Sequence, residues 1–496
     1  MNRPLLYAGL NVAVATACII GSGLHRGVAH PIYVLLLFAI CSIPILQAKP
    51  LNGRYALAAL WCGYYFVMYG ALDLQHLVLG ADQDIVISDG IFDMGELVIL
   101  VGAALFQIAY RAACRTPTGA PPAQAKDWSE RSLVLFGLVL WVVAARLSWQ
   151  FSVNLMYEKS NVVTQEVLAS LGPWRVAMYI TGRMALPVAI MMLAYAQCRY
   201  RRPYMLPIVI GIALYQLFYG FVIDTKSEAL IGCILVLLTN LLITARIPKF
   251  WLIPVVLVIF LAFPVLQANR VARDEHNQTS HTASQHILKS FEEALHAKDR
   301  VNSGRERAQT ALERTTTKGS VELIVSRTGV TQGFQHGYTL LPLLTAFIPR
   351  IVWPDKPSIP TGQIMNHEFH VSEAAETFIS PSHLGELYWN FGWPGILLGI
   401  PLMGFMFGTL GRKFDLAEAP TITRLLVLVV TVRLVVLGAE GEIATGYVTW
   451  MRSLVGIGLL HLVFARIPYI GARKVGETRP ADSGMGRLTP FPNLLR

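Results

Sequence analysis

A histidine and three glutamates are the residues whose types and spacing could move a proton. His383 and Glu386 are three residues apart, so a helix would place both side chains on one face. Glu440 and Glu442 lie in a short polar break between two apolar stretches. A carboxylate or an imidazole can act as a general base toward a hydroxyl group. Helix capping or ion pairing is the structural alternative for each of the four.

A stiff, cationic segment precedes these residues. The stretch AFIPRIVWPDKPSIPTG (346–362) contains four prolines together with Arg350, Trp353 and Lys356. Proline fixes φ, so the segment presents its cations with little conformational freedom. Cations held in place can bind and stabilise a negatively charged group, and Arg327 is a further candidate. Trp353 could stack on a sugar or anchor the segment at a membrane surface, where tryptophan is enriched.

The composition requires membrane helices to position these residues. Of 496 residues, 54% are hydrophobic and 15% are charged, whereas soluble domains carry about 25% charged residues. Apolar runs of roughly 17–25 residues, the length that crosses a bilayer, recur along the chain. We therefore predict an all-α polytopic membrane protein with twelve transmembrane helices. The predicted spans are 4–22, 31–47, 55–72, 92–110, 132–151, 174–196, 204–222, 228–245, 250–267, 391–410, 421–438 and 447–465.

The loops between these spans alternate in charge. One set, with the two terminal segments, carries 21 lysines and arginines, whereas the short loops of the other set carry three. The positive-inside rule places the first set, and both termini, in the cytoplasm. Residues 268–380 then form a large extracytoplasmic loop with amphipathic helices. The predicted organisation is 1–267 with nine spans, this loop, 381–470 with three spans, and a cytoplasmic tail at 471–496.

Five arginines lie inside or at the edge of predicted spans, all toward the extracytoplasmic side. An arginine at a helix centre costs roughly 2.5–3.5 kcal/mol, so such residues usually face a bundle interior or a water-filled cavity. Internal ion pairs, for example with Glu440, are the structural alternative. The five arginines, together with Lys226 in a short loop, favour an anionic ligand. The planar guanidinium group of arginine donates two parallel hydrogen bonds to phosphate. The five are Arg146, Arg175, Arg183, Arg433 and Arg452.

Several other classes of site are not expected. The six cysteines lie in or near the apolar spans, and no CxxC pair occurs. The sequence NHEFH around His367 and His370 lacks the HExxH spacing of a zinc site, so no metal or cofactor is predicted. The net charge of +10 follows from loop topology, so no nucleic-acid partner is predicted.

Two motifs resemble a known family. FIPRIVWPDKP (347–357) resembles the Pro-Arg…Trp-Pro-x-Lys-Pro segment of Wzy-type oligosaccharide repeat-unit polymerases, which include O-antigen polymerases. SPSHLGELYWNFGWPGILLG (380–399) resembles the Gly-Glu-x-Tyr-x-Asn-Phe-Gly segment of the same family. The turn DTKSEALI (224–231) occupies the place of a basic turn but has one lysine where arginine is expected. The motif match covers only 347–399.

The resemblance implies a GT-C-like architecture and an inverting, metal-independent glycosyltransferase at the outer face of the bacterial inner membrane. The enzyme would transfer a glycan from its undecaprenyl-pyrophosphate carrier to a new lipid-linked repeat unit, with a Wzz-like chain-length regulator as partner. Glu386, His383, Glu440 or Glu442 would supply the base. The residues expected to bind the pyrophosphate and the glycan are Arg350, Lys356, Arg327, Arg183, Arg146, Arg452, Arg433, Lys226 and Trp353.

Two alternatives to a polymerase remain open. An O-antigen ligase uses the same donor but transfers the glycan to a lipid A core. A lipid-linked oligosaccharide flippase needs charged residues along a path through both leaflets, whereas here they gather on one side.

Overall fold

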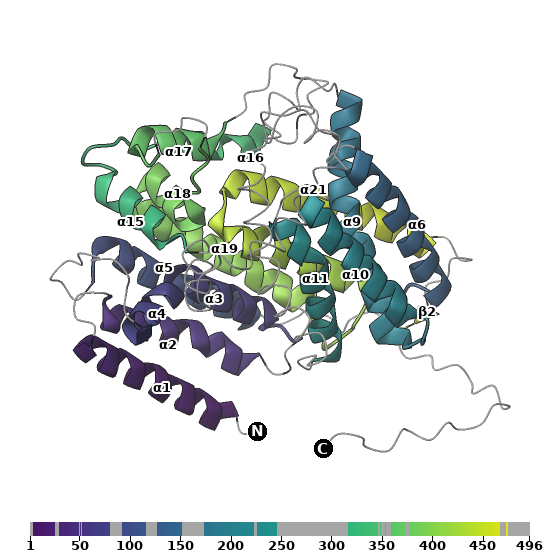
Figure 1. Ribbon diagram of the computed structural model, residues 1–496, viewed down its shortest axis with the longest axis horizontal. Coiled ribbons are helices and arrows are strands. Elements are labelled where there is room, and N and C mark those ends of the chain that lie inside the picture. The colour runs from purple at the N-terminus through teal and green to yellow at the C-terminus, as the bar shows by residue number, and fades with distance from the viewer. Residues whose placement is uncertain are drawn as a thin grey trace, which may run out of the picture.

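The chain is helical throughout nearly all of the residues that the structure describes (Figure 1). Apart from turns and loops, the other described elements are an antiparallel pair of two-residue strands, β1 (Lys126–Asp127) and β2 (Arg473–Lys474), and one isolated bridge. The computed structural model describes residues 3–24, 29–48, 50, 52–79, 92–115, 126–150, 173–222, 226–245, 316–345, 348, 353, 359–372, 377–466 and 473–474.

The helices fall into two groups along the chain. The first group is α1 (Arg3–Leu24), α2 (Pro31–Gln47), α3 (Ala56–Tyr69), α4 (Ala71–Leu79), α5 (Met94–Arg115), α6 (Glu130–Ser148), α9 (Pro173–Tyr200), α10 (Met205–Val222) and α11 (Lys226–Thr244). The second group is α15 (Lys318–Arg327), η3 (Tyr338–Leu340), α16 (Leu341–Thr345), α17 (Thr361–Phe369), α18 (Ser382–Phe391), α19 (Trp393–Lys413), α20 (Ile422–Thr431), η4 (Val432–Val436), η5 (Leu437–Glu440) and α21 (Ile443–Arg466).

Five helices in the described part of the chain are long and apolar enough to cross a membrane. They are α5, α6, α19, the continuous segment Ile422–Glu440, and Ile443–Val463 within α21. A sixth is added if α3 and α4, which meet at an angle of 51°, form one broken span. The protein is therefore a helical membrane protein. Helices also occupy the other predicted spans except 250–267, which lies outside the described residues, and the count of twelve stays a prediction.

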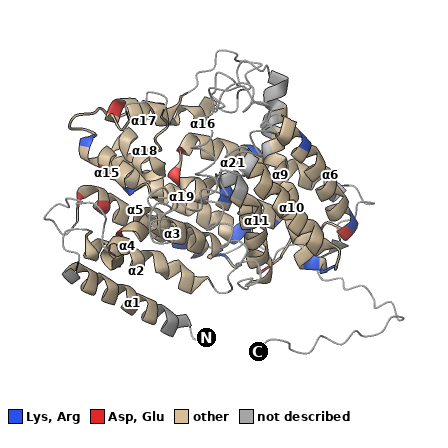
Figure 2. Ribbon diagram, in the orientation of Figure 1, with Lys and Arg blue, Asp and Glu red and all other residues tan. Residues whose placement is uncertain are grey.

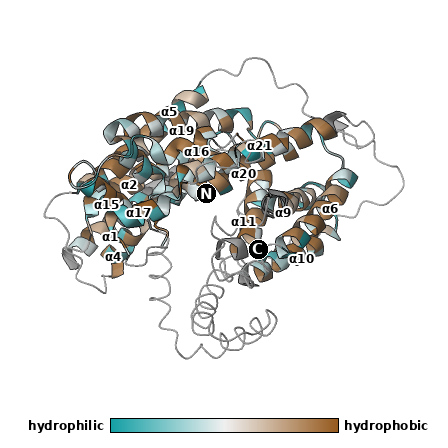
Figure 3. Ribbon diagram, turned by 90° about the horizontal axis from the view of Figure 1, so that it is seen from above, coloured by the Kyte–Doolittle hydropathy of each residue, from teal (hydrophilic) through white to brown (hydrophobic). Residues whose placement is uncertain are grey.

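The outer surface of the helices fits contact with lipid. Large apolar side chains recur at helical spacing along one face of α19, where Leu398 and Leu402 are 74% and 69% exposed and Phe405 is exposed as well. Charged residues are few along the helices (Figure 2), and apolar colour predominates on α5, α19 and α21 (Figure 3). Exposure of such an apolar face to water is unfavourable, whereas its contact with the hydrocarbon core of a bilayer is favourable.

Helices α5 and α19 pack closely because α19 carries glycines at the contact. A Cβ atom on Gly404 would lie 2.4 Å from the carbonyl oxygen of Phe106, and one on Gly408 would lie 2.5 Å from that of Tyr110. Two glycines four residues apart allow two membrane helices to approach this closely. Since both contact residues advance in the same direction, the two helices run parallel.

The buried Asp127 connects three parts of the chain at one end of the Ile422–Glu440 segment. Its Oδ1 accepts hydrogen bonds from the backbone N–H of Trp128 at 2.9 Å and of Ile422 at 3.2 Å. The hydroxyl of Tyr195 on α9 contacts the same carboxylate and lies 2.8 Å from the Pro420 carbonyl oxygen. We call these residues the Asp127 junction. It fixes the start of α20 against α9 and the residues before α6.

Candidate functional site

Helix α18 and the loop before η3 form one hydrogen-bonded unit. The N–H groups of Gln335 and His336 donate to the carbonyl oxygens of Trp389 and Asn390, at 3.0 and 3.1 Å. The side chain of Asn390 accepts from Gly337 N–H at 2.8 Å and donates to the Thr339 hydroxyl at 2.7 Å. These bonds fix the C-terminal end of α18, and His383 and Glu386 lie in the first half of this helix.

Glu386 is fully buried, and only one of its carboxyl oxygens has a hydrogen-bond partner among the described residues. Its Oε2 accepts from the N–H of Ile443, the first residue of α21, at 2.7 Å. Its Oε1 has no such partner. Burial raises the pKa of Glu386 to about 8, and the charge of Glu442 adds to this, whereas the hydrogen bond from Ile443 N–H lowers it.

His383 lies beside Glu386 on α18 and is also buried. Its ring packs at a tilt against Tyr447 of α21, with ring centroids 5.5 Å apart. Neither its Nε2 nor the Tyr447 hydroxyl has a hydrogen-bond partner in the part of the chain described. Burial lowers the pKa of His383 to about 3, so the imidazole is neutral near pH 7.

Glu440 and Glu442 lie where the Ile422–Glu440 segment turns into α21. Tyr64 of α3 donates to Glu440 Oε2 at 3.0 Å, and Gly362 N–H donates to Glu442 Oε1 at 3.0 Å. The Thr445 hydroxyl donates to the other oxygen of Glu442 at 2.7 Å. Burial raises the pKa of Glu442.

The four residues that the sequence singled out for proton transfer therefore lie on elements that touch one another. Helix α18 packs against η5 and α21, and α3 packs against η5. The Tyr69 hydroxyl donates to Ser382 Oγ at 3.0 Å, which connects α3 directly to the start of α18. We refer to Glu386, His383, Glu440 and Glu442 as the acidic site.

The predicted cations are only partly described. Arg350 and Lys356 lie outside the described residues. Arg183 and Arg175 belong to α9, and Lys226 begins α11, but the structure does not describe the side chains of these three residues.

Among the described candidates, Arg146 on α6, Arg452 on α21 and Trp353 are exposed, and Arg433 is half-buried in η4. Arg327 is exposed at the end of α15 and donates to the Phe369 carbonyl oxygen at 2.9 Å, so it connects α15 to α17. Binding of pyrophosphate by any of these cations stays a prediction.

A buried charge cluster near α5 was missed by the sequence reasoning. Lys318 Nζ lies 2.5 Å from Asp73 Oδ2, 2.6 Å from Glu96 Oε1 and 3.3 Å from Glu322 Oε1. His30 Nδ1 lies 2.5 Å from the second oxygen of Glu96. Burial alone lowers the pKa of Lys318, but the three carboxylates raise it above its usual value. Acidic residues inside apolar runs were the available signal, because a buried charge needs a partner.

Among the described residues, this cluster also contains the one group of carboxylates arranged closely enough to resemble a cation site. Carboxylate oxygens of Asp93, Glu96 and Glu322 lie within 4.8 Å of one another. Lys318 already places its ammonium group against two of these residues. The cluster therefore has its own positive charge and serves to hold α15 against α5.

The fold and the acidic site define a helical membrane protein in which two buried ionisable groups, His383 and Glu386, lie beside the half-buried Glu442 and the exposed Glu440. The chain belongs to the family described as "Domain of unknown function (DUF8712)", whose model matches residues 166–417. No curated protein and no solved structure matches the chain. The family match includes His383 and Glu386 and ends before Glu440 and Glu442.

Proposed function

We propose that this protein is a membrane glycosyltransferase of the Wzy type. It polymerises undecaprenyl-pyrophosphate-linked oligosaccharide repeat units into an O-antigen or exopolysaccharide. The single observation that carries the proposal is Glu386, a buried carboxyl with one oxygen held by α21 and the other without a partner among the described residues. In this proposal the chain has twelve spans in a GT-C-like arrangement, both termini are cytoplasmic, and the acidic site is periplasmic.

Glu386 is the best candidate for the base because of its pKa. A general base works best when its pKa lies near the working pH, and Glu386 at about 8 is closer than His383 at about 3. Glu386 is mostly protonated at pH 7, and its ionised fraction rises as the pH increases. His383 stays neutral and is available to hydrogen-bond a sugar hydroxyl.

The transfer step follows from this assignment. The acceptor hydroxyl gives its proton to Glu386 Oε1 while its oxygen attacks the anomeric carbon of the donor. The bond between that carbon and the pyrophosphate breaks, and its electron pair leaves with the lipid pyrophosphate. The predicted cations, Arg350 and Lys356 first among them, would stabilise the charge on the leaving group.

The test is chain extension by the purified protein in lipid nanodiscs, supplied with a synthetic polyprenyl-pyrophosphate-linked repeat unit. We expect wild-type protein to lengthen this substrate and Glu386→Gln to reduce the rate by about 10²–10⁴-fold, the usual contribution of a general base. Glu418→Gln is the matched control, because Glu418 is exposed and lies 3.9 Å from Arg424, away from the acidic site.

Two further arms separate the alternatives. Transfer of the glycan only to an added lipid A core acceptor would identify a ligase. Movement of the intact substrate across a liposome membrane without new glycosidic bonds would identify a flippase. Folded wild-type protein that forms no new bond with either acceptor would overturn the proposal.

A further inference from the structure

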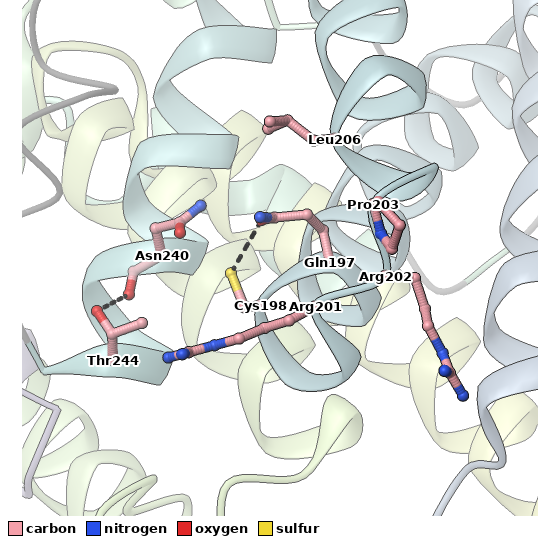
Figure 4. A pocket seen from close by; sticks show the side chains of 8 residues that line it. All are labelled: Gln197, Cys198, Arg201, Arg202, Pro203, Leu206, Asn240 and Thr244. Atoms are coloured by element: carbon pink, nitrogen blue, oxygen red, sulfur yellow. Dashed lines mark hydrogen bonds between the residues drawn. The ribbon is translucent and has the colours of Figure 1, made fainter. Parts of the chain in front are cut away.

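A second site lies at the ends of three helices. A cavity of about 440 Å³ is bounded by the end of α9, the start of α10 and the end of α11 (Figure 4). Gln197, Arg201, Asn240 and Thr244 give it a polar wall, and Leu206 lies on its apolar side. None of the residues that line it is acidic.

This cavity is separate from the acidic site. Tyr195, two residues before Gln197, is part of the Asp127 junction at the start of the Ile422–Glu440 segment. Glu440 of the acidic site ends the same segment. Nineteen helical residues span roughly 28 Å at about 1.5 Å per residue, so the two sites lie near opposite ends of one span.

The two arginines at the cavity differ in their partners. Arg202 makes a two-pronged ion pair with Glu130, from Nε at 2.8 Å and from Nη2 at 3.1 Å, and in Figure 4 it points away from Asn240 and Thr244. Arg201 instead extends past Cys198 toward Thr244 (Figure 4). Arg201 is exposed, and it has no ion pair and no side-chain hydrogen bond among the described residues, so its guanidinium group is accessible to an anion.

The backbone at Arg201 also indicates a constrained position. Its N–H donates to the Gln197 carbonyl oxygen at 3.0 Å, and its φ is 50°, in the left-handed region. Glycine is usual at this position after a helix, and other residues there carry backbone strain. From this position the Arg201 side chain extends toward Thr244 at the end of α11 (Figure 4).

We propose that this cavity binds a phosphate group, in the form of an anionic phospholipid headgroup or a free phosphate. A guanidinium fork donates two parallel hydrogen bonds to phosphate oxygens, and the Gln197 amide can add a donor. The apolar side favours a phosphate that carries a hydrocarbon tail. Leu206 lies in the first turn of α10, and this helix exposes Leu214 and Phe218, so acyl chains can follow it into the bilayer.

The test is native mass spectrometry of the full-length protein in detergent, with added phosphatidylglycerol. We expect Arg201→Gln to reduce lipid retention at least tenfold and Arg202→Gln to leave it unchanged. Gln197→Glu places a carboxylate beside Arg201 and should abolish retention while keeping the side-chain shape. Competition by inorganic phosphate would show that a free phosphate enters the same site, and its absence would identify the lipid headgroup.

Two results would contradict phosphate binding in this cavity. If Arg201 only neutralises the negative ends of α9 and α11, then Arg201→Gln will lower the unfolding temperature and leave lipid retention equal to that of Arg202→Gln. Equal retention by wild type, Arg201→Gln and Gln197→Glu would overturn the proposal. Neither outcome depends on glycosyltransferase activity.

Discussion

At the residue scale, the central feature is a carboxyl group that folding keeps protonated. Burial raises the pKa of Glu386 to about 8, from a usual value of 4.5. A base must lose its proton to work, whereas the folded protein holds this proton more tightly than the unfolded chain does. The proposed catalysis at Glu386 and the stability of the fold therefore have opposite pH dependences.

This opposition gives a prediction for stability. Because the folded-state pKa is raised, the stabilisation is fully present below about pH 4.5 and is lost as the pH rises through 8. At about 1.4 kcal/mol per pKa unit, the full loss is on the order of 5 kcal/mol. We expect the unfolding temperature of wild type in detergent to fall between about pH 5 and 8.5 by more than that of Glu386→Gln. Parallel curves for the two, with Glu418→Gln as control, would contradict the assignment.

The sequence predicted that His383 and Glu386 lie side by side but not which residues hold the acidic site, for a physical reason. The spacing of His383 and Glu386 fixes their shared face within one helix, so local geometry was enough. The hydroxyl group that holds Glu440 comes from Tyr64, which is 376 positions away in the chain. Such a partner is brought near only by helix packing, which spacing along the sequence does not encode.

At the element scale, the apolar runs predicted where the helices lie but not how they are joined. The predicted span 55–72 ends at Tyr69, and the chain turns by 51° into α4. The short helices α17 and α18 and the loop between α15 and η3 depend on side-chain hydrogen bonds such as those of Asn390. Hydropathy carries no signal for those bonds.

The contact between α5 and α19 yields a second prediction. A side chain at position 404 must displace the backbone of α5, since even its Cβ would lie 2.4 Å from the Phe106 carbonyl oxygen. We expect Gly404→Val to cost about 1–3 kcal/mol or more and to lower the unfolding temperature in detergent. Gly458→Val in α21 is the matched control, because a Cβ there meets no atom within 4 Å. Equal unfolding temperatures for the two variants would rule out the close contact.

At the scale of the whole molecule, buried charges join the part of the chain after residue 316 to the N-terminal helices. Lys318 contacts Asp73 of α4 and Glu96 of α5, and its ammonium group lies 4.6 Å from the ring of Tyr33 on α2. Removal of one partner of a buried ion pair leaves the other charge without compensation. The cluster therefore makes the position of α15 depend on three earlier helices.

We expect Lys318→Met to destabilise the protein by about 3–5 kcal/mol, measured as a lower unfolding temperature. Lys413→Met at the exposed end of α19 should have little effect. The double variant Lys318→Met with Asp73→Asn should recover part of the loss, because it removes one of the uncompensated charges. No difference between Lys318→Met and Lys413→Met would show that the cluster contributes nothing to the fold.

The π-helical segment η4 lies between the two ends of the Ile422–Glu440 span. A π turn accommodates one residue more than an α turn, and such segments are frequent at functional sites. If η4 rewound as an α-helix with the Asp127 junction held in place, Glu440 would rotate by about 100° around the helix axis and leave Tyr64. The acidic site thus depends on a single surplus residue within a membrane helix, and the register of that helix sets which side chains lie beside Tyr64.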